Sequence, residues 1–193
     1  KSKVLKLAYL YRSRLISLVA NWMRVGYCQG NFNSDNCAAG GYTLDYGPFG
    51  FCELFDPRFQ PWIGGGEHFS FFNQPSAAEI NFKTFCSSLK PLLSESEEDI
   101  ELLEQIENDF SELMNQELKK MWANKLGLEH YHETIINDFF NLMLISKADY
   151  TILFRKLSDI PDNIVPLKES FYLPINEELK NKWEVWIQNW QSI

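Results

Sequence analysis

Apolar side chains recur at steps of three and four residues over most of this chain, and this spacing favours helices. The first such stretch covers about residues 3–26, where one apolar stripe would lie along one face of a helix. The stripe consists of Val4, Leu7, Ala8, Tyr11, Leu15, Leu18, Val19 and Trp22. Lysines and arginines fall mostly on the other face, and Gly26 marks the end. The spacing predicts a long amphipathic helix that leads into a segment of a different kind.

Residues 26–80 contain most of the glycines, many aromatic side chains and a single basic residue, Arg58. A loop-rich segment of this length is uncommon unless it is functional or disordered. The aromatic side chains need burial, which argues against disorder. We therefore expect ordered loops around short strands, with one strand over Tyr42–Tyr46, and we expect the chemistry to lie here.

The helical spacing returns from residue 77. The dense acidic run that follows Ser94 is interpreted as the solvent-facing side of one long helix, capped by Ser94 or Ser96. The tryptophans at 183, 186 and 190 are interpreted as core packing, or else as an apolar face that needs a partner. The predicted helices cover about residues 80–92, 95–128, 133–146 and 149–157, with a final tryptophan-rich helix.

Composition excludes several classes of protein. The 193 residues carry a net charge of −8 and are 45% hydrophobic, which is typical of a globular domain. The apolar runs are shorter than the ~20 residues of a membrane span, and an acidic chain is a poor nucleic-acid binder. Four cysteines without C-x-x-C spacing indicate neither a zinc ribbon nor a disulfide scaffold, so a reducing compartment is expected. No targeting segment is recognised.

Asp35, Asn36 and Asp45 are the candidate chemical groups. Asp35 and Asn36 lie in an Asn-Ser-Asp-Asn turn, and Asp45 begins Asp-Tyr-Gly after a short apolar stretch. If a hairpin joins them, Asn36 and Asp45 would converge, and their oxygens suit Mg²⁺. A neighbouring carboxylate would then accept a proton from an attacking hydroxyl. The same residues also fit ordinary turn chemistry or a two-carboxylate hydrolase.

Several blocks of the sequence resemble the selenoprotein O (SelO) family. The most specific is Leu44–Phe51 (LDYGPFGF), which follows the Asn33–Asn36 turn. The others are Leu18–Trp22, Val25–Gly30, Asp56-Pro57, Asn73-Gln74-Pro75, Lys125-Leu126-Gly127-Leu128, Ala148-Asp149-Tyr150-Thr151 and Phe154-Arg155.

The resemblance implies a mainly α (α+β overall) fold: a protein-kinase-like C-terminal lobe with a catalytic loop, a short β-hairpin and extra C-terminal helices. Residues 1–93 would form the catalytic core and residues 94–193 a helical extension, with the N-terminal lobe lying upstream. It implies transfer of AMP from ATP to Ser, Thr or Tyr hydroxyls of proteins, with Mg²⁺ or Mn²⁺. By motif, Asp35 would be the general base, and Asn36 and Asp45 the metal ligands through which ATP is held.

Two departures and two rival functions accompany this resemblance. Gln29 stands where most members have His, and Ser34 replaces Thr.

The Gly64–His68 segment has no following Lys and is not interpreted as a phosphate-binding loop. His68, His130 and His132 are interpreted as surface histidines. A non-catalytic pseudokinase that binds partners and a phosphotransferase on the same fold remain alternatives. Taken alone, residues 1–193 are expected to bind nucleotide poorly. The protein is expected in the cytoplasm if it is bacterial and in the mitochondrion if it is eukaryotic.

Overall fold

The computed structural model describes residues 2–193, which are mostly helical with one small antiparallel sheet, so the expected mainly α class is confirmed. The sheet pairs β1 (Tyr27–Gln29) with β2 (Phe49–Phe51), and short 3-10 turns link several elements. The helices are α1 (Ser2–Val25), α2 (Gln74–Leu89), α3 (Glu97–Asn108), α4 (Phe110–Lys125), α5 (Glu133–Ile145), α6 (Tyr150–Leu157) and α7 (Glu177–Gln191).

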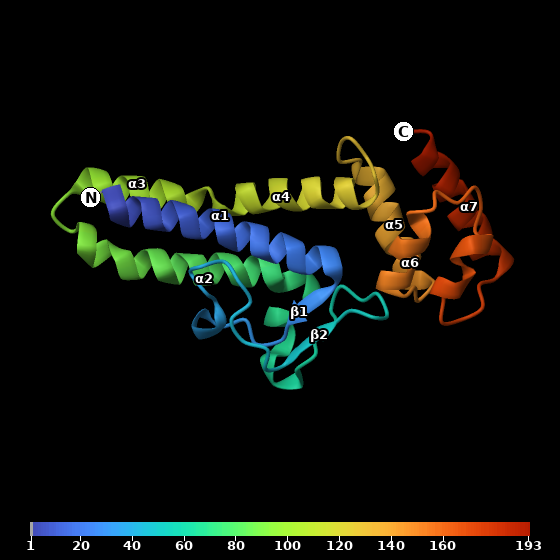
Figure 1. The fold of residues 1–193 in the computed structure, drawn as a ribbon, viewed down its shortest axis with the longest axis horizontal. Helices are drawn as coiled ribbons and strands as arrows, with labels where there is room; N and C mark the ends of the chain where they lie inside the picture. The colour runs from blue at the N-terminus through green and yellow to red at the C-terminus, as the bar shows by residue number, and fades with distance from the viewer. Residues whose placement is uncertain (1) are drawn as a thin grey trace.

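The first helix is the centre of an elongated helical layer. It lies between α2 on one side and α3 with α4 on the other (Figure 1). Its predicted stripe is largely buried, with Ala8, Leu15 and Val19 fully enclosed, although Leu7 is 45% exposed. Because this stripe is buried against three helices, the orientation of α1 is fixed, and so is the position at which the chain enters β1.

The expected single helix over residues 95–128 is wrong, because the chain forms α3 and α4 with a break at Asp109. The buried Arg12 side chain on α1 donates to the Ile106 carbonyl at 2.8 Å and contacts the Asp109 carboxylate at 3.3 Å. In a continuous helix the Ile106 carbonyl would accept from the Phe110 N–H instead. A long-range contact therefore interrupts a locally helical sequence.

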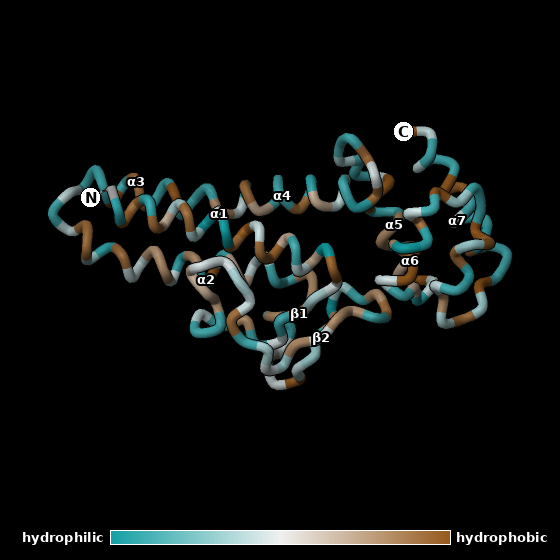
Figure 2. The backbone as a smooth tube through the Cα atoms, in the orientation of Figure 1, coloured by the Kyte–Doolittle hydropathy of each residue, from teal (hydrophilic) through white to brown (hydrophobic). Residues whose placement is uncertain are grey.

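The acidic run behaves as expected in most positions. Ser96 caps α3 by accepting from the Asp99 N–H, and most of the acidic side chains on α3 and α4 face solvent, although Asp99 is buried. Hydrophilic and hydrophobic positions alternate along both helices (Figure 2).

A second core joins the end of α4 to α5, α6 and α7 at one end of the molecule (Figure 1). Trp183, Trp186 and Trp190 are all buried in it, which confirms their expected packing role. The indole N–H of Trp186 donates to the Ile135 carbonyl and that of Trp190 to the Leu126 carbonyl, both at 2.9 Å. Among the helices of residues 2–193, none is long and apolar enough to cross a bilayer.

Candidate functional site

The β1–β2 hairpin supports the loop that carries the candidate residues. After α1, the chain turns at Gly26, whose φ of 76° favours glycine, and enters β1. In the hairpin, Tyr27 pairs with Phe51 and Gln29 with Phe49. The expected strand over Tyr42–Tyr46 is wrong, because the strands lie on either side of the loop that contains this segment.

Asp35 and Asn36 lie in a one-turn 3-10 helix, Ser34–Asn36, within this loop. The Asn36 amide nitrogen donates to the Asn31 carbonyl at 2.8 Å. This bond leaves the amide oxygen of Asn36 available as a ligand atom. Asp35 is exposed, so a substrate group can approach its carboxylate from solvent.

Asp45 is half-buried and fixed by two hydrogen bonds. Its Oδ1 accepts from the Gly47 N–H at 2.9 Å, an Asx turn, and its carbonyl accepts from Gln29 Nε2 at 2.6 Å. Oδ2 forms no hydrogen bond with the described residues 2–193 and remains available to a ligand. The turn role and a ligand role are therefore compatible in one carboxylate.

One backbone bridge brings the two halves of the loop together. Cys37 pairs with Thr43 in antiparallel fashion, so Asn36 and Asp45 each lie within two residues of the same bridge. Two side chains of α1 hold this bridge. The Tyr11 hydroxyl lies 3.0 Å from Cys37 Sγ, and the Trp22 indole donates to Thr43 Oγ1 at 2.9 Å.

A buried pair of glutamines, Gln29 and Gln74, adjoins the loop, and the residue pattern did not indicate it. Gln74, at the start of α2, accepts from the Gln29 N–H at 2.9 Å and donates to the Tyr27 and Phe71 carbonyls at 3.0 and 3.1 Å. Both glutamines are fully buried. Gln29, noted above only as a departure from His, therefore connects α2 to the backbone of Asp45. The available signal was a glutamine immediately before the proline that starts a helix.

The donor set of the loop is suited to a hard divalent cation. No cluster of three or more His, Cys, Asp or Glu gathers anywhere in residues 2–193, so a site made only of such side chains is absent there. Mg²⁺ commonly uses one or two protein carboxylates and completes its octahedron with waters and substrate phosphates. The Asn36 and Asp45 oxygens match that requirement.

The buried cysteines Cys28 and Cys52 are poorly suited to nucleophilic chemistry. All four cysteines are free, and burial raises the pKa of Cys28 to about 12 and of Cys52 to about 11, so both remain thiols at neutral pH. His68, His130 and His132 are exposed, as expected.

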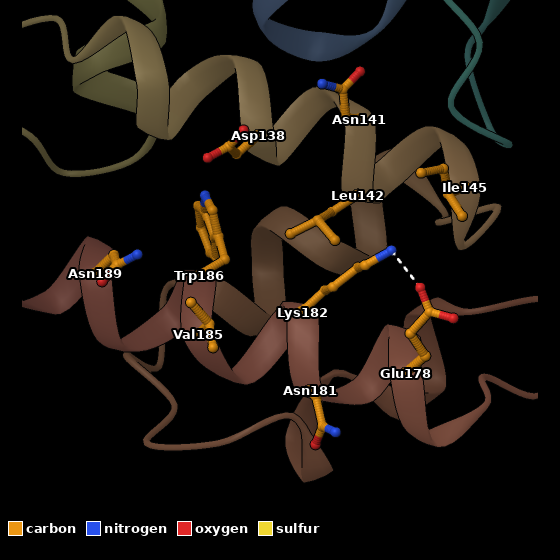
Figure 3. Close-up of a pocket in the computed structure, with 10 residues that line it drawn as sticks. All are labelled: Asp138, Asn141, Leu142, Ile145, Glu178, Asn181, Lys182, Val185, Trp186 and Asn189. Carbon is orange, nitrogen blue, oxygen red and sulfur yellow. Dashed lines mark hydrogen bonds and ion pairs between the residues drawn. The ribbon is translucent and has the colours of Figure 1, made fainter.

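A groove of about 490 Å³ lies between α5 and α7 (Figure 3), and no residue of the candidate loop lines it. In it, Lys182 is already paired with Glu178 at 2.7 Å, and Asp138 is the one further carboxylate among the lining residues. We assign no chemistry to this groove.

Comparison with known proteins provides a family. The family model described as protein adenylyltransferase SelO matches residues 6–193. The chain is 32% identical over 182 residues to the protein nucleotidyltransferase YdiU of Aromatoleum aromaticum, and 35% identical over 170 residues to that of Nitrosospira multiformis. These alignments cover 88% and 85% of this chain but 34% and 29% of the relatives. The chain therefore spans about a third of the length of these relatives.

Proposed function

Because the chain belongs to the SelO family of protein adenylyltransferases, we propose that it supplies the base and the metal ligands of such an enzyme. The reaction moves AMP from ATP to a Ser, Thr or Tyr hydroxyl of a protein. The hydroxyl oxygen forms a bond to the α-phosphorus, the bond from that phosphorus to diphosphate breaks, and diphosphate leaves.

The observation that supports this proposal is the Cys37–Thr43 bridge, because Asn36 directly precedes Cys37 and Asp45 follows Thr43 by two residues. In the proposed roles, the exposed carboxylate of Asp35 takes the proton from the attacking hydroxyl. The amide oxygen of Asn36 and Oδ2 of Asp45 would hold Mg²⁺ or Mn²⁺. When bound, the cation would neutralise charge on the ATP phosphates.

We also propose that the fold is a protein-kinase-like C-terminal lobe. The order of elements supports it: the long helix α1 leads into β1, and the loop between β1 and β2 carries first Asp35 and then Asp45-Tyr46-Gly47. In the proposed fold, Asp45-Tyr46-Gly47 would correspond to the kinase Asp-Phe-Gly element. Residues 1–93 would form its catalytic core and residues 94–193 its helical extension, with the phosphate-holding basic residues in a separate lobe.

The test uses ATP labelled on either the α- or the γ-phosphate, Mg²⁺ or Mn²⁺, and the protein at its natural length. Transfer of α-label to a protein hydroxyl is expected, with a loss of about 100-fold or more in Asp45→Asn. This variant retains an oxygen to accept from Gly47 N–H, so it changes the ligand charge while keeping the turn. Asp35→Asn tests the base, and Mn²⁺ affinity measured by electron paramagnetic resonance separates the two roles, because it should fall only in Asp45→Asn.

The rival functions give different results in the same assay. Transfer of the γ-label alone would indicate a phosphotransferase. No transfer of either label by a folded protein would indicate a non-catalytic partner-binding role. Unchanged α-label transfer by Asp45→Asn would refute the proposed ligand.

A further inference from the structure

Three of the sequence blocks that carry the family resemblance lie in the C-terminal half of the chain and have no part in the proposed transfer chemistry. They contain Lys125 at the end of α4, and Tyr150, Thr151, Phe154 and Arg155 on α6. All of these residues line one pocket of about 370 Å³, together with Arg24 and Val25 at the end of α1 and Ser158 just after α6. Hydrogen bonds from Lys125 to Arg24 and from Tyr150 to Met23 join α4 and α6 to the end of α1 beside this pocket.

The pocket collects positive charge in an acidic chain. Three of its eight lining residues are the cations Arg24, Lys125 and Arg155, and none of the eight is Asp or Glu. Within residues 2–193, none of the three forms an ion pair with a carboxylate. The sequence as a whole has eight more acidic than basic residues by formal charge. The absence of Asp and Glu from the lining of this pocket is therefore a local feature, because carboxylates are abundant in the sequence.

Lys125 is held in place by neutral partners. Its Nζ donates to the Arg24 carbonyl at 2.6 Å and lies 3.8 Å from the centroid of the Phe154 ring and 4.9 Å from that of Tyr150. Burial and the neighbouring Arg24 charge lower the pKa of Lys125 to about 8. The ammonium of the half-buried Lys125 is thus partly desolvated and repelled by a nearby cation, and a bound anion would relieve the repulsion.

The ends of three helices account for only part of this charge. Arg24, Lys125 and Arg155 each lie in the last turn of their helix, where the dipole favours cations. Each helix end is equivalent to about −0.5 charge, so three ends offset about half of the three positive charges. Arg24 and Arg155 are exposed residues, so a ligand can approach them from solvent, although Arg24 Nε already donates to Asn21 Oδ1 at 3.0 Å.

From this convergence we propose that Arg24, Lys125 and Arg155 form a binding site for the phosphoryl group of a small phosphate-bearing molecule. Guanidinium groups bind phosphate oxygens in bidentate fashion, and a phosphate dianion matches the residual charge better than a carboxylate does. The Thr151 hydroxyl, which also lines the pocket, adds a donor. The site is separate from Asp35 and Asp45 and does not rest on the proposed function.

The experiment titrates inorganic phosphate into the protein at its natural length by isothermal titration calorimetry, at constant ionic strength. All variants carry Asp45→Ala as well, so that binding at the catalytic loop is weakened equally in each. Arg24→Gln and Arg155→Gln are expected to weaken phosphate binding by about 10-fold or more each, since each loses a charge-assisted hydrogen bond. Lys168→Gln, which removes one exposed charge elsewhere, should leave the affinity within about two-fold.

Circular dichroism of each variant checks that it is folded. We expect folding to be retained because Arg24 and Arg155 are exposed. The inference is overturned if phosphate does not bind at millimolar concentration, or if Arg24→Gln and Arg155→Gln bind it as well as Lys168→Gln does. Failure of AMP transfer with phosphate binding intact would refute the proposed function and leave this site standing.

Discussion

Replacement of Gln74 by leucine tests whether the buried glutamine holds the candidate loop. Leucine has a similar volume but cannot form any of the three hydrogen bonds that link Gln74 to Gln29, Tyr27 and Phe71. Each such bond contributes about 1 kcal/mol net, and more where a buried partner is left unsatisfied. We therefore expect Gln74→Leu to lower the free energy of unfolding by about 3 kcal/mol.

Urea denaturation followed by tryptophan fluorescence measures this loss, and a thermal scan should show a decrease in Tm of about 6–12 °C. The matched control is Gln116→Leu on α4, where the side chain is exposed and donates only to Glu112, one turn earlier. This control should lose less than about 0.5 kcal/mol. A Gln74→Leu loss no larger than that of Gln116→Leu would refute the reasoning, because the three bonds would then contribute nothing to the loop.

Two further predictions concern the junction of α1 with α6. Gly26 and Gly127 both have positive φ, but a Cβ on Gly26 would lie 2.9 Å from the Tyr150 ring, whereas one on Gly127 has no neighbour within 4 Å. Gly26→Ala should therefore destabilise by about 1–3 kcal/mol and clearly more than Gly127→Ala in urea titrations; equal losses would contradict the contact. For Lys125, whose pKa is lowered from 10.5 to about 8, the unfolded chain binds more protons than the folded chain between those two values. The free energy of unfolding of the wild type should therefore rise relative to Lys125→Met as pH increases from about 8 to about 10.5, and parallel curves would contradict the lowered pKa of the half-buried Lys125.

Features that depend on near neighbours in the chain could be predicted from residue order. Apolar spacing predicted α1, α5 and α6 to within a few residues, because the interactions that define a helix lie three and four positions apart. The Ser96 cap was recognisable for the same reason. The Asx turn of Asp45 is also local, since its carboxylate accepts from the backbone two residues later.

Features that depend on distant partners required the tertiary structure. The break between α3 and α4 occurs where Arg12 donates a hydrogen bond to the Ile106 carbonyl, 94 residues later in the chain. The cationic pocket depends on Lys125 reaching the Arg24 carbonyl across 101 residues. The roles proposed for Asp35, Asn36 and Asp45 came from resemblance, and spacing alone did not separate them from an ordinary turn.

The sequence predicts some features and not others because helices and turns depend on nearby residues, whereas buried polar groups depend on hydrogen-bond partners from distant segments. A helical stripe or a turn is encoded within a few residues, so the helices and the Asp45 turn follow from residue order. A buried amide or cation is stable only where another segment supplies its partner. Packing of α1 against α2, α4 and α6 therefore decided where Gln74 and Lys125 find their hydrogen-bond acceptors.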